Sequence, residues 1–187
     1  MTYSIIQPPF TLKFRDMSKK DLVAYAAWFH DAMPGRIAEL ANAVRASPGH
    51  EDWQASASPE SLDELGRWFE GQVETRRRSA EELAEIRSKL AFPIDIPEEE
   101  LTDRTFSLAF DLGMYFAQVV LSHLPGTRWD QPFGSKKLAD YGQPVILGFG
   151  PVALNPVHVM VTTAYGIASK KPAGLRELYD TWAGMKR

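Results

Sequence analysis

The sequence contains no cysteine among its 187 residues. Disulfide scaffolds, cysteine-based zinc sites, iron–sulfur clusters and thiol nucleophiles are therefore excluded. The four histidines also lack the H-x-x-x-H and H-E-x-x-H spacings of metal ligands; they are His30, His50, His123 and His158. We therefore expect no bound metal and interpret the histidines as structural or surface residues.

Signatures of cofactor binding and nucleophilic catalysis are lacking as well. Gly148 and Gly150 are followed by Pro151 rather than by the glycines that open a phosphate-binding helix. Neither a dinucleotide-binding fingerprint nor a P-loop is therefore present. No serine lies in a G-x-S-x-G elbow. We expect no cofactor.

The chain also lacks an uninterrupted hydrophobic run of membrane-spanning length. Residues 105–124 approach that length, but polar residues interrupt them, namely Ser107, Asp111, Gln118 and Ser122. The first nine residues have no basic region followed by a long apolar core, so they do not resemble a secretory signal. We expect a soluble, cytoplasmic protein with no membrane partner.

Charge is distributed unevenly along the chain. Residues 126–187 contain eight Lys or Arg against four Asp or Glu, a net charge of +4, which leaves −7 on residues 1–125. Because duplex binding needs a concentrated basic stripe, this pattern argues against a nucleic-acid partner. The acidic half could attract a basic protein, or its charges could simply form a solvated surface.

Composition and periodicity predict an α+β fold, dominated by helices, in a single domain over residues 1–187. Hydrophobic residues make up 44% of the chain, which is sufficient for a real core. We expect residues 1–97 to be mainly helical. Residues 98–187 should hold a buried central helix at 105–124, a small antiparallel sheet packed on that helix, and two C-terminal helices. Segments 127–130 and 143–149 predict the strands of a hairpin with a long loop.

Capping patterns predict where several helices begin. Ser18 and Ser79 each have an acidic residue three positions on, and Asn155 precedes a proline. Ser58-Pro59 has the same form and predicts a helix start, whereas Pro34-Gly35 should kink or split the first helix. Inward positions of the helix after Ser79 are predicted at Leu83, Ile86 and Leu90. Glu98, Glu99, Glu100 and Asp103 are predicted to lie at the start of the central helix, where they complement its dipole.

A polar arc on the central helix contains the candidate catalytic residues. Asp111, Tyr115 and Gln118 fall in this arc, one turn apart. A buried carboxylate beside a phenol could transfer protons, which is the chemistry of a small hydrolase-like or other enzyme. Alternatively, the arc faces water, or it pairs with an arginine or with backbone of the neighbouring hairpin.

Candidate partner-binding residues lie outside that helix. Trp53 sits in a polar loop, where an exposed tryptophan could anchor a partner or could fold back onto a helix. Trp129 lies in a predicted strand. Arg76, Arg77 and Arg78 form the densest basic run, which could bind an anion or partner or could form local ion pairs with the flanking glutamates.

The chain from Ser107 onward resembles a loosely defined group of uncharacterised bacterial proteins. The resemblance rests on Leu112-Gly113-Met-Tyr115, Gly126-Thr-Arg-Trp129, Pro144-Val145, Asn155-Pro156-Val157 and Leu175-Arg-Glu-Leu178-Tyr179, with Ser58-Pro-Glu-Ser-Leu62 as a further element. It departs from the group at Ala117-Gln118, where Gly-Glu is usual. Small proteins of this kind resemble immunity or accessory proteins that bind a toxin. The resemblance thus implies an immunity-type or accessory role. Together with the uneven charge and the lack of a catalytic signature, it leads us to expect a non-enzymatic protein that binds a toxin or another copy of the chain through its acidic helical surface.

Overall fold

The computed structural model describes residues 3–90, 92 and 94–186, and its centre is helix α4 (Asp103–His123). Two-thirds of the residues of α4 are buried, as predicted for the central helix. Thr102 caps it by accepting a hydrogen bond from the N–H of Thr105. The predicted acidic first turn is wrong for Glu98, Glu99 and Glu100, which precede the helix, and right for Asp103.

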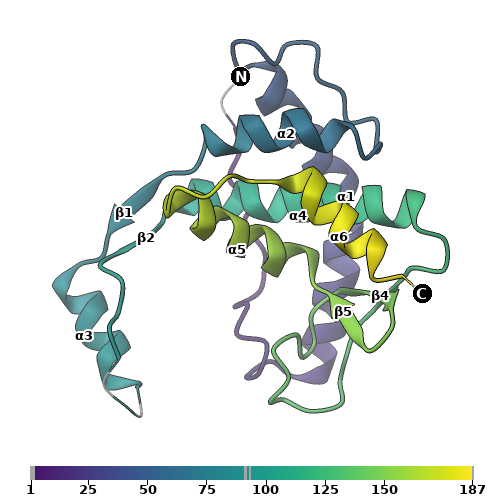
Figure 1. Ribbon diagram of the computed structural model, residues 1–187. Coiled ribbons are helices and arrows are strands. Elements are labelled where there is room, and N and C mark those ends of the chain that lie inside the picture. The colour runs from purple at the N-terminus through teal and green to yellow at the C-terminus, as the bar shows by residue number, and fades with distance from the viewer. Residues whose placement is uncertain (1–2, 91, 93, 187) are drawn as a thin grey trace.

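Two long helices enclose α4. Helix α5 (Pro156–Ala168) runs beside it, and α1 (Lys19–Arg45) crosses it (Figure 1). Close approach of α4 and α5 depends on Gly113, because a Cβ there would lie 2.8 Å from the Cα of Val157. The predicted cap of α5 is confirmed: Asn155 accepts from the N–H of His158, and Pro156 occupies the first turn.

Helix α1 continues through Pro34, so of the two predicted alternatives, a kink or a split, the split is wrong. Ser18 caps its start as expected. Buried side chains on both sides of the proline, Phe29 before it and Leu40 and Val44 after it, pack against the rest of the core. This packing outweighs the loss of one helical hydrogen bond at Pro34.

Helices α2 (Ser61–Glu70) and α6 (Leu175–Gly184) pack together on another side of the core. The predicted start of α2 at Ser58-Pro59 is two residues early. These residues form a turn instead, in which the carbonyl groups of Ser58 and Pro59 accept from the N–H groups of Ser61 and Leu62.

A three-stranded antiparallel sheet follows α4, in the order β3-β4-β5, built from β3 (Arg128–Asp130), β4 (Val145–Phe149) and β5 (Val152–Leu154). The predicted hairpin is confirmed, with Trp129 opposite Ile146, whereas β5 was not predicted. Ile146, Phe149 and Leu154 belong to the same apolar core as α4. The helix-dominated α+β class is therefore correct.

A second, two-stranded sheet forms the base of a projecting arm, residues 75–101 (Figure 1). Strand β1 (Thr75–Arg77) pairs antiparallel with β2 (Glu99–Leu101), and α3 (Ala80–Ser88) lies between them in the chain. The predicted capping box at Ser79 is present. The predicted inward positions Leu83, Ile86 and Leu90 are half-buried, but no residue of α3 is fully buried, because the arm carries the helix away from the core.

Helix α4 is the one described helix that is long and apolar enough to cross a membrane. In its most apolar window, 78% of the residues are buried inside the protein. Such burial is typical of the core helix of a soluble protein.

Candidate functional site

A buried ion pair lies where α1 crosses α4. Arg36 donates from Nε to Oδ1 of Asp111 at 2.8 Å and from Nη2 to Oδ2 at 2.7 Å. The Asp111 side chain is fully buried and that of Arg36 is 14% exposed. This bidentate geometry is the strong form of an arginine–carboxylate contact.

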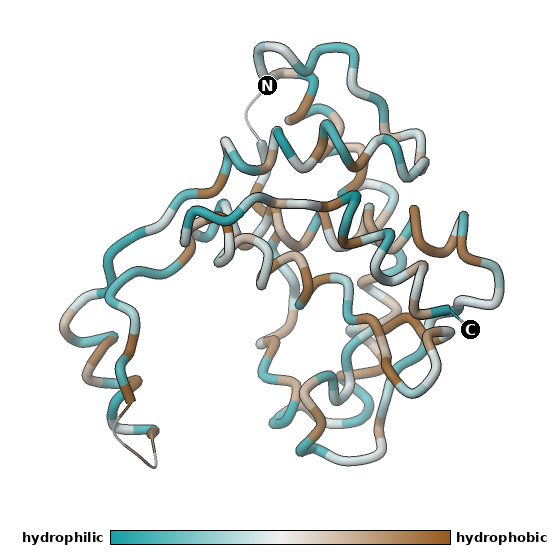
Figure 2. Tube along the Cα trace, in the orientation of Figure 1, coloured by the Kyte–Doolittle hydropathy of each residue, from teal (hydrophilic) through white to brown (hydrophobic). Residues whose placement is uncertain are grey.

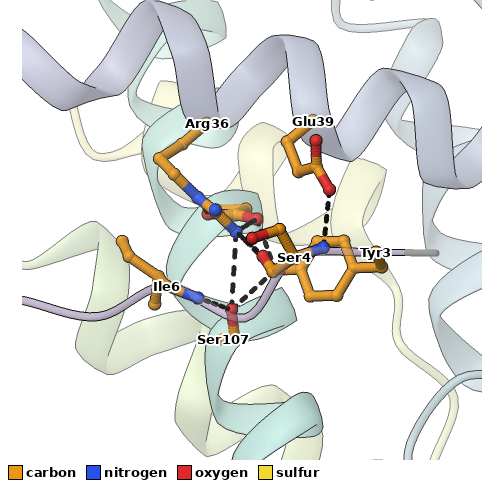
Figure 3. A network of polar contacts seen from close by, with 7 residues as sticks. Tyr3, Ser4, Ile6, Arg36, Glu39 and Ser107 are labelled. Carbon is orange, nitrogen blue, oxygen red and sulfur yellow. Dashed lines mark hydrogen bonds and ion pairs between the residues drawn. The ribbon is translucent and has the colours of Figure 1, made fainter. Parts of the chain in front are cut away.

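The N-terminal segment, residues 3–14, is tied to this pair (Figure 3). The hydroxyl of Tyr3 donates to Oδ2 of Asp111 at 2.5 Å and accepts from Nη2 of Arg36 at 2.9 Å. The N–H of Ile6 donates to Oγ of Ser107 at 2.8 Å, and Arg36 also donates to the carbonyl of Ser4. We call Tyr3, Arg36, Ser107 and Asp111 the Asp111 network.

Burial dominates the electrostatics of this network. It raises the pKa of Asp111, although hydrogen bonds from Arg36 and Tyr3 oppose the rise. Burial also raises the pKa of Tyr3, and the neighbouring Asp111 raises it further, so the phenol remains a neutral donor. Burial lowers the pKa of Arg36, but its contacts with Asp111 more than compensate, so the net shift is upward. The three hydrogen bonds to Asp111 suit anchoring of the N-terminal segment better than proton transfer.

The other two candidate catalytic residues of the polar arc, Tyr115 and Gln118, have different neighbours. Tyr115 Oη lies 2.6 Å from Ser61 Oγ and accepts from the N–H of Ala57 at 3.1 Å. Burial raises the pKa of Tyr115. Oε1 of Gln118 is buried and has no partner among the described residues. No hydrogen bond between described residues joins Asp111, Tyr115 and Gln118, so the structure does not assemble them into one reactive cluster.

Trp53 and Trp129 both contact the body of the protein. Trp53 is only 3% exposed, so the expectation of an exposed anchor is not met. Its Nε1 donates to the carbonyl of Ser61, and its ring meets Tyr115 edge-on, which folds it back onto α2 and α4. Trp129 is half-buried and packs edge-on against Phe29 and His30.

The three consecutive arginines lie in or beside β1 and form ion pairs within the arm. Arg76 contacts Glu82 and Glu100, and Arg78 also contacts Glu100. Arg77 reaches Glu98 at 2.7 Å and remains mostly exposed. Pairing with glutamates therefore accounts for this run, but only the contact with Glu82 is the predicted local one, since Glu98 and Glu100 lie about 20 residues further along the chain.

The arm exposes large apolar side chains between α3 and β2. Phe92 is 77% exposed and Ile94 is 63% exposed, the two highest values among the large exposed hydrophobic residues described. In Figure 2, hydrophobic and hydrophilic segments alternate along the arm, with no second layer covering it. Contiguous exposed apolar surface is typical of interaction sites, so these two neighbouring side chains mark a candidate site.

An apolar cavity of about 540 Å³ lies beside the Asp111 network. The N-terminal segment, α1, α4 and α5 form its walls together with residues 143–144. Sequence reasoning missed this cavity and the roles of Tyr3 and Arg36. One available signal was Asp111 itself, since a lone acid in an apolar helix requires a buried cation or donor.

Among residues 3–90, 92 and 94–186, no group of three or more His, Asp or Glu side chains is placed to hold a metal ion. Comparisons of the chain with protein-family models, with curated proteins and with solved structures find no match.

Proposed function

We propose that this chain is a non-enzymatic, cytoplasmic protein-binding protein and that its arm makes the principal contact with the partner. The observation that carries the proposal is the exposure of Phe92 and Ile94 on an element that projects from the body. Burying such side chains against a partner would remove apolar surface from water, which is the main favourable contribution to protein association.

Charge favours a basic partner. Residues 75–101 contain seven acidic and five basic residues, and the acidic ones are Glu81, Glu82, Glu85, Asp95, Glu98, Glu99 and Glu100. Most of the arginines already pair with glutamates in the arm, whereas Glu81, Glu99 and Asp95 are exposed. Complementary charge accelerates encounter and selects the partner. A basic toxin, neutralised by an immunity-type protein, fits this description.

The enzymatic alternative has less support in the geometry. It requires Asp111, Tyr115 and Gln118 to converge on a cavity, but none of the three lines the cavity beside the Asp111 network. Asp111 is engaged by Arg36 and Tyr3, and Tyr115 by Ser61.

An affinity experiment with matched variants tests the proposal. The full chain, F92S/I94S and a control V23S/V152S are immobilised and exposed to a lysate at low and high salt. Val23 and Val152 are exposed apolar residues of the body, 51% and 47% respectively. We expect the full chain and the control to retain a partner of basic isoelectric point at low salt. High salt should weaken this binding, and F92S/I94S should not retain the partner.

Two results would contradict the proposal. Equal capture by F92S/I94S and the control would show that the arm does not make the contact. The purified chain could also sediment as a dimer, and F92S/I94S as a monomer. That result would show that the arm binds a second copy of the chain instead of a basic partner.

A further inference from the structure

The cavity beside the Asp111 network has walls that are mainly apolar, with polar side chains contributed by Gln7, Tyr25, Asp103, Ser107, Gln143 and Asn155. Its volume of about 540 Å³ lies within the range of roughly 300–1,000 Å³ that is usual for small-molecule sites. Apolar and aromatic side chains from three helices and the N-terminal segment line it, including Ile6, Phe14, Phe29, Phe106, Phe110 and Val161. This arrangement favours an apolar ligand. The cavity is separate from the arm, which the proposed function uses.

The polar groups of the wall are largely occupied by partners within the protein. Asn155 donates to Asp140 and Gln143 and accepts from the N–H of His158. Gln143 donates to the carbonyl of Ala139. Ser107 belongs to the Asp111 network. A highly polar ligand would therefore find few hydrogen-bonding groups to replace its water.

The charge of the wall excludes an anionic ligand. Among the described residues that line the cavity there is no Lys, Arg or His, and the one charged side chain is that of Asp103. A carboxylate or phosphate would lose its hydration without gaining a counter-charge. Nearby Arg36 is already committed to Asp111.

Two wall residues, Gln7 and Tyr25, have a side-chain donor that forms no hydrogen bond with a described residue; Gln7 is exposed to water, whereas Tyr25 is buried. Tyr25 is 3% exposed, and no described residue forms a hydrogen bond with its hydroxyl. Burial raises its pKa, so the phenol stays protonated. The hydroxyl oxygen is not among the fully enclosed polar atoms, so the hydroxyl can meet water, and a bound molecule with an acceptor atom would replace that water as its partner.

We propose that this cavity binds a neutral, mainly apolar small molecule that presents one hydrogen-bond acceptor to the hydroxyl of Tyr25. The aromatic rings around Tyr25, those of Phe10, Phe14 and Phe29, hold the phenol in place at centroid distances of 5.0 to 6.3 Å. The N-terminal segment supplies one wall, so its attachment to the Asp111 network also keeps the site formed.

Fluorescence titration with the neutral apolar dye N-phenyl-1-naphthylamine tests whether the site exists. We expect saturable binding at one site per chain, which V161W reduces at least tenfold by filling the cavity. V23W is the matched control, because Val23 is exposed on α1 and does not line the cavity. Circular dichroism establishes that both variants are folded. No saturable binding, or equal binding by the two variants, would overturn the proposal.

Competition on the unmodified chain tests the ligand class without relying on a cavity-filling variant. We expect 1-decanol to displace the dye and decanoate, of equal chain length but negatively charged, to displace it at least tenfold less well. Y25F should weaken displacement by 1-decanol about 2- to 10-fold, the worth of one hydrogen bond, and leave the dye itself little affected. Equal competition by decanoate would overturn the neutral class, and unchanged competition in Y25F would overturn the role of Tyr25.

Discussion

The Asp111 network and the arm use the same chemistry, arginine paired with carboxylate, in opposite surroundings. Asp111 is fully buried and holds Arg36 and Tyr3 where α1, α4 and the N-terminal segment meet. In the arm, the side chains of Arg76 and Glu82 are 45% and 39% exposed. Because water screens the second pair and not the first, similar distances correspond to very different energies.

This difference separates the parts of the molecule that hold the fold together from those that are free for binding. Removing one partner of a buried pair leaves an uncompensated charge, whereas water replaces the missing partner of an exposed pair. The body should therefore respond globally to single changes and the arm only locally. The four predictions below test that contrast.

The largest effect is expected for Asp111→Ala. It leaves the guanidinium of Arg36 mostly buried without its carboxylate, and it also removes the acceptor of Tyr3. We expect a loss of about 3–5 kcal/mol in the free energy of unfolding, measured by urea denaturation. The double variant R36M/D111L, which removes both charges, should be more stable than Asp111→Ala. A loss under about 1 kcal/mol would contradict the contrast between the two regions.

A smaller effect is expected where two helices of the body meet at Gly113. A Cβ there would lie within 3 Å of backbone atoms of Pro156 and Val157, which cannot move aside as a side chain could. We expect Gly113→Ala to cost about 1–3 kcal/mol in urea denaturation. Gly35 in α1 is the control, since a Cβ there meets nothing within 4 Å. Gly35→Ala should stabilise the protein by about 0.5–1 kcal/mol through helix propensity, and a similar loss in both variants would refute the close-packing explanation.

Local sequence patterns predicted several features of both the body and the arm. Caps at Ser18, Ser79 and Asn155 and the hairpin around Trp129 depend on neighbours in the chain, and the structure contains all of them. The apolar residues around most of the circumference of α4 likewise indicated that this helix is buried. Caps and periodicity depend on residues only a few positions apart, so they can be recognised from a single sequence.

Features that depend on distant contacts were not predictable in the same way. Helix α3 has an apolar periodicity that indicates an inward face, but the pairing of β1 with β2 carries it away from any core. Trp53 lies in a polar loop and is nonetheless buried against Tyr115. Tyr3 and Arg36 meet Asp111 across separations of 108 and 75 residues, which no local pattern encodes.

The arm should respond only locally when one of its ion pairs is removed. Arg76→Gln removes the contacts with Glu82 and Glu100. We expect the urea midpoint of the whole chain to remain unchanged within error, while amide hydrogen exchange accelerates within α3. A shift of the global midpoint comparable to that of Gly113→Ala would show that the arm is part of the cooperative core after all.

The smallest effect concerns pH and the start of α3. Hydrogen bonds from Arg76 and from the N–H of Ser79 lower the pKa of Glu82 to about 2. Because the folded-state pKa lies below the unfolded value, the ionised carboxylate stabilises α3 above about pH 4.5, and this contribution is lost as the pH falls toward 2. An NMR titration of the Glu82 carboxyl group should give this low midpoint in the unmodified chain and a higher one in Arg76→Gln. Equal midpoints in the two proteins would mean that the exposed pair does not persist in solution, so that the arm is held by its backbone ladder and the capping box alone.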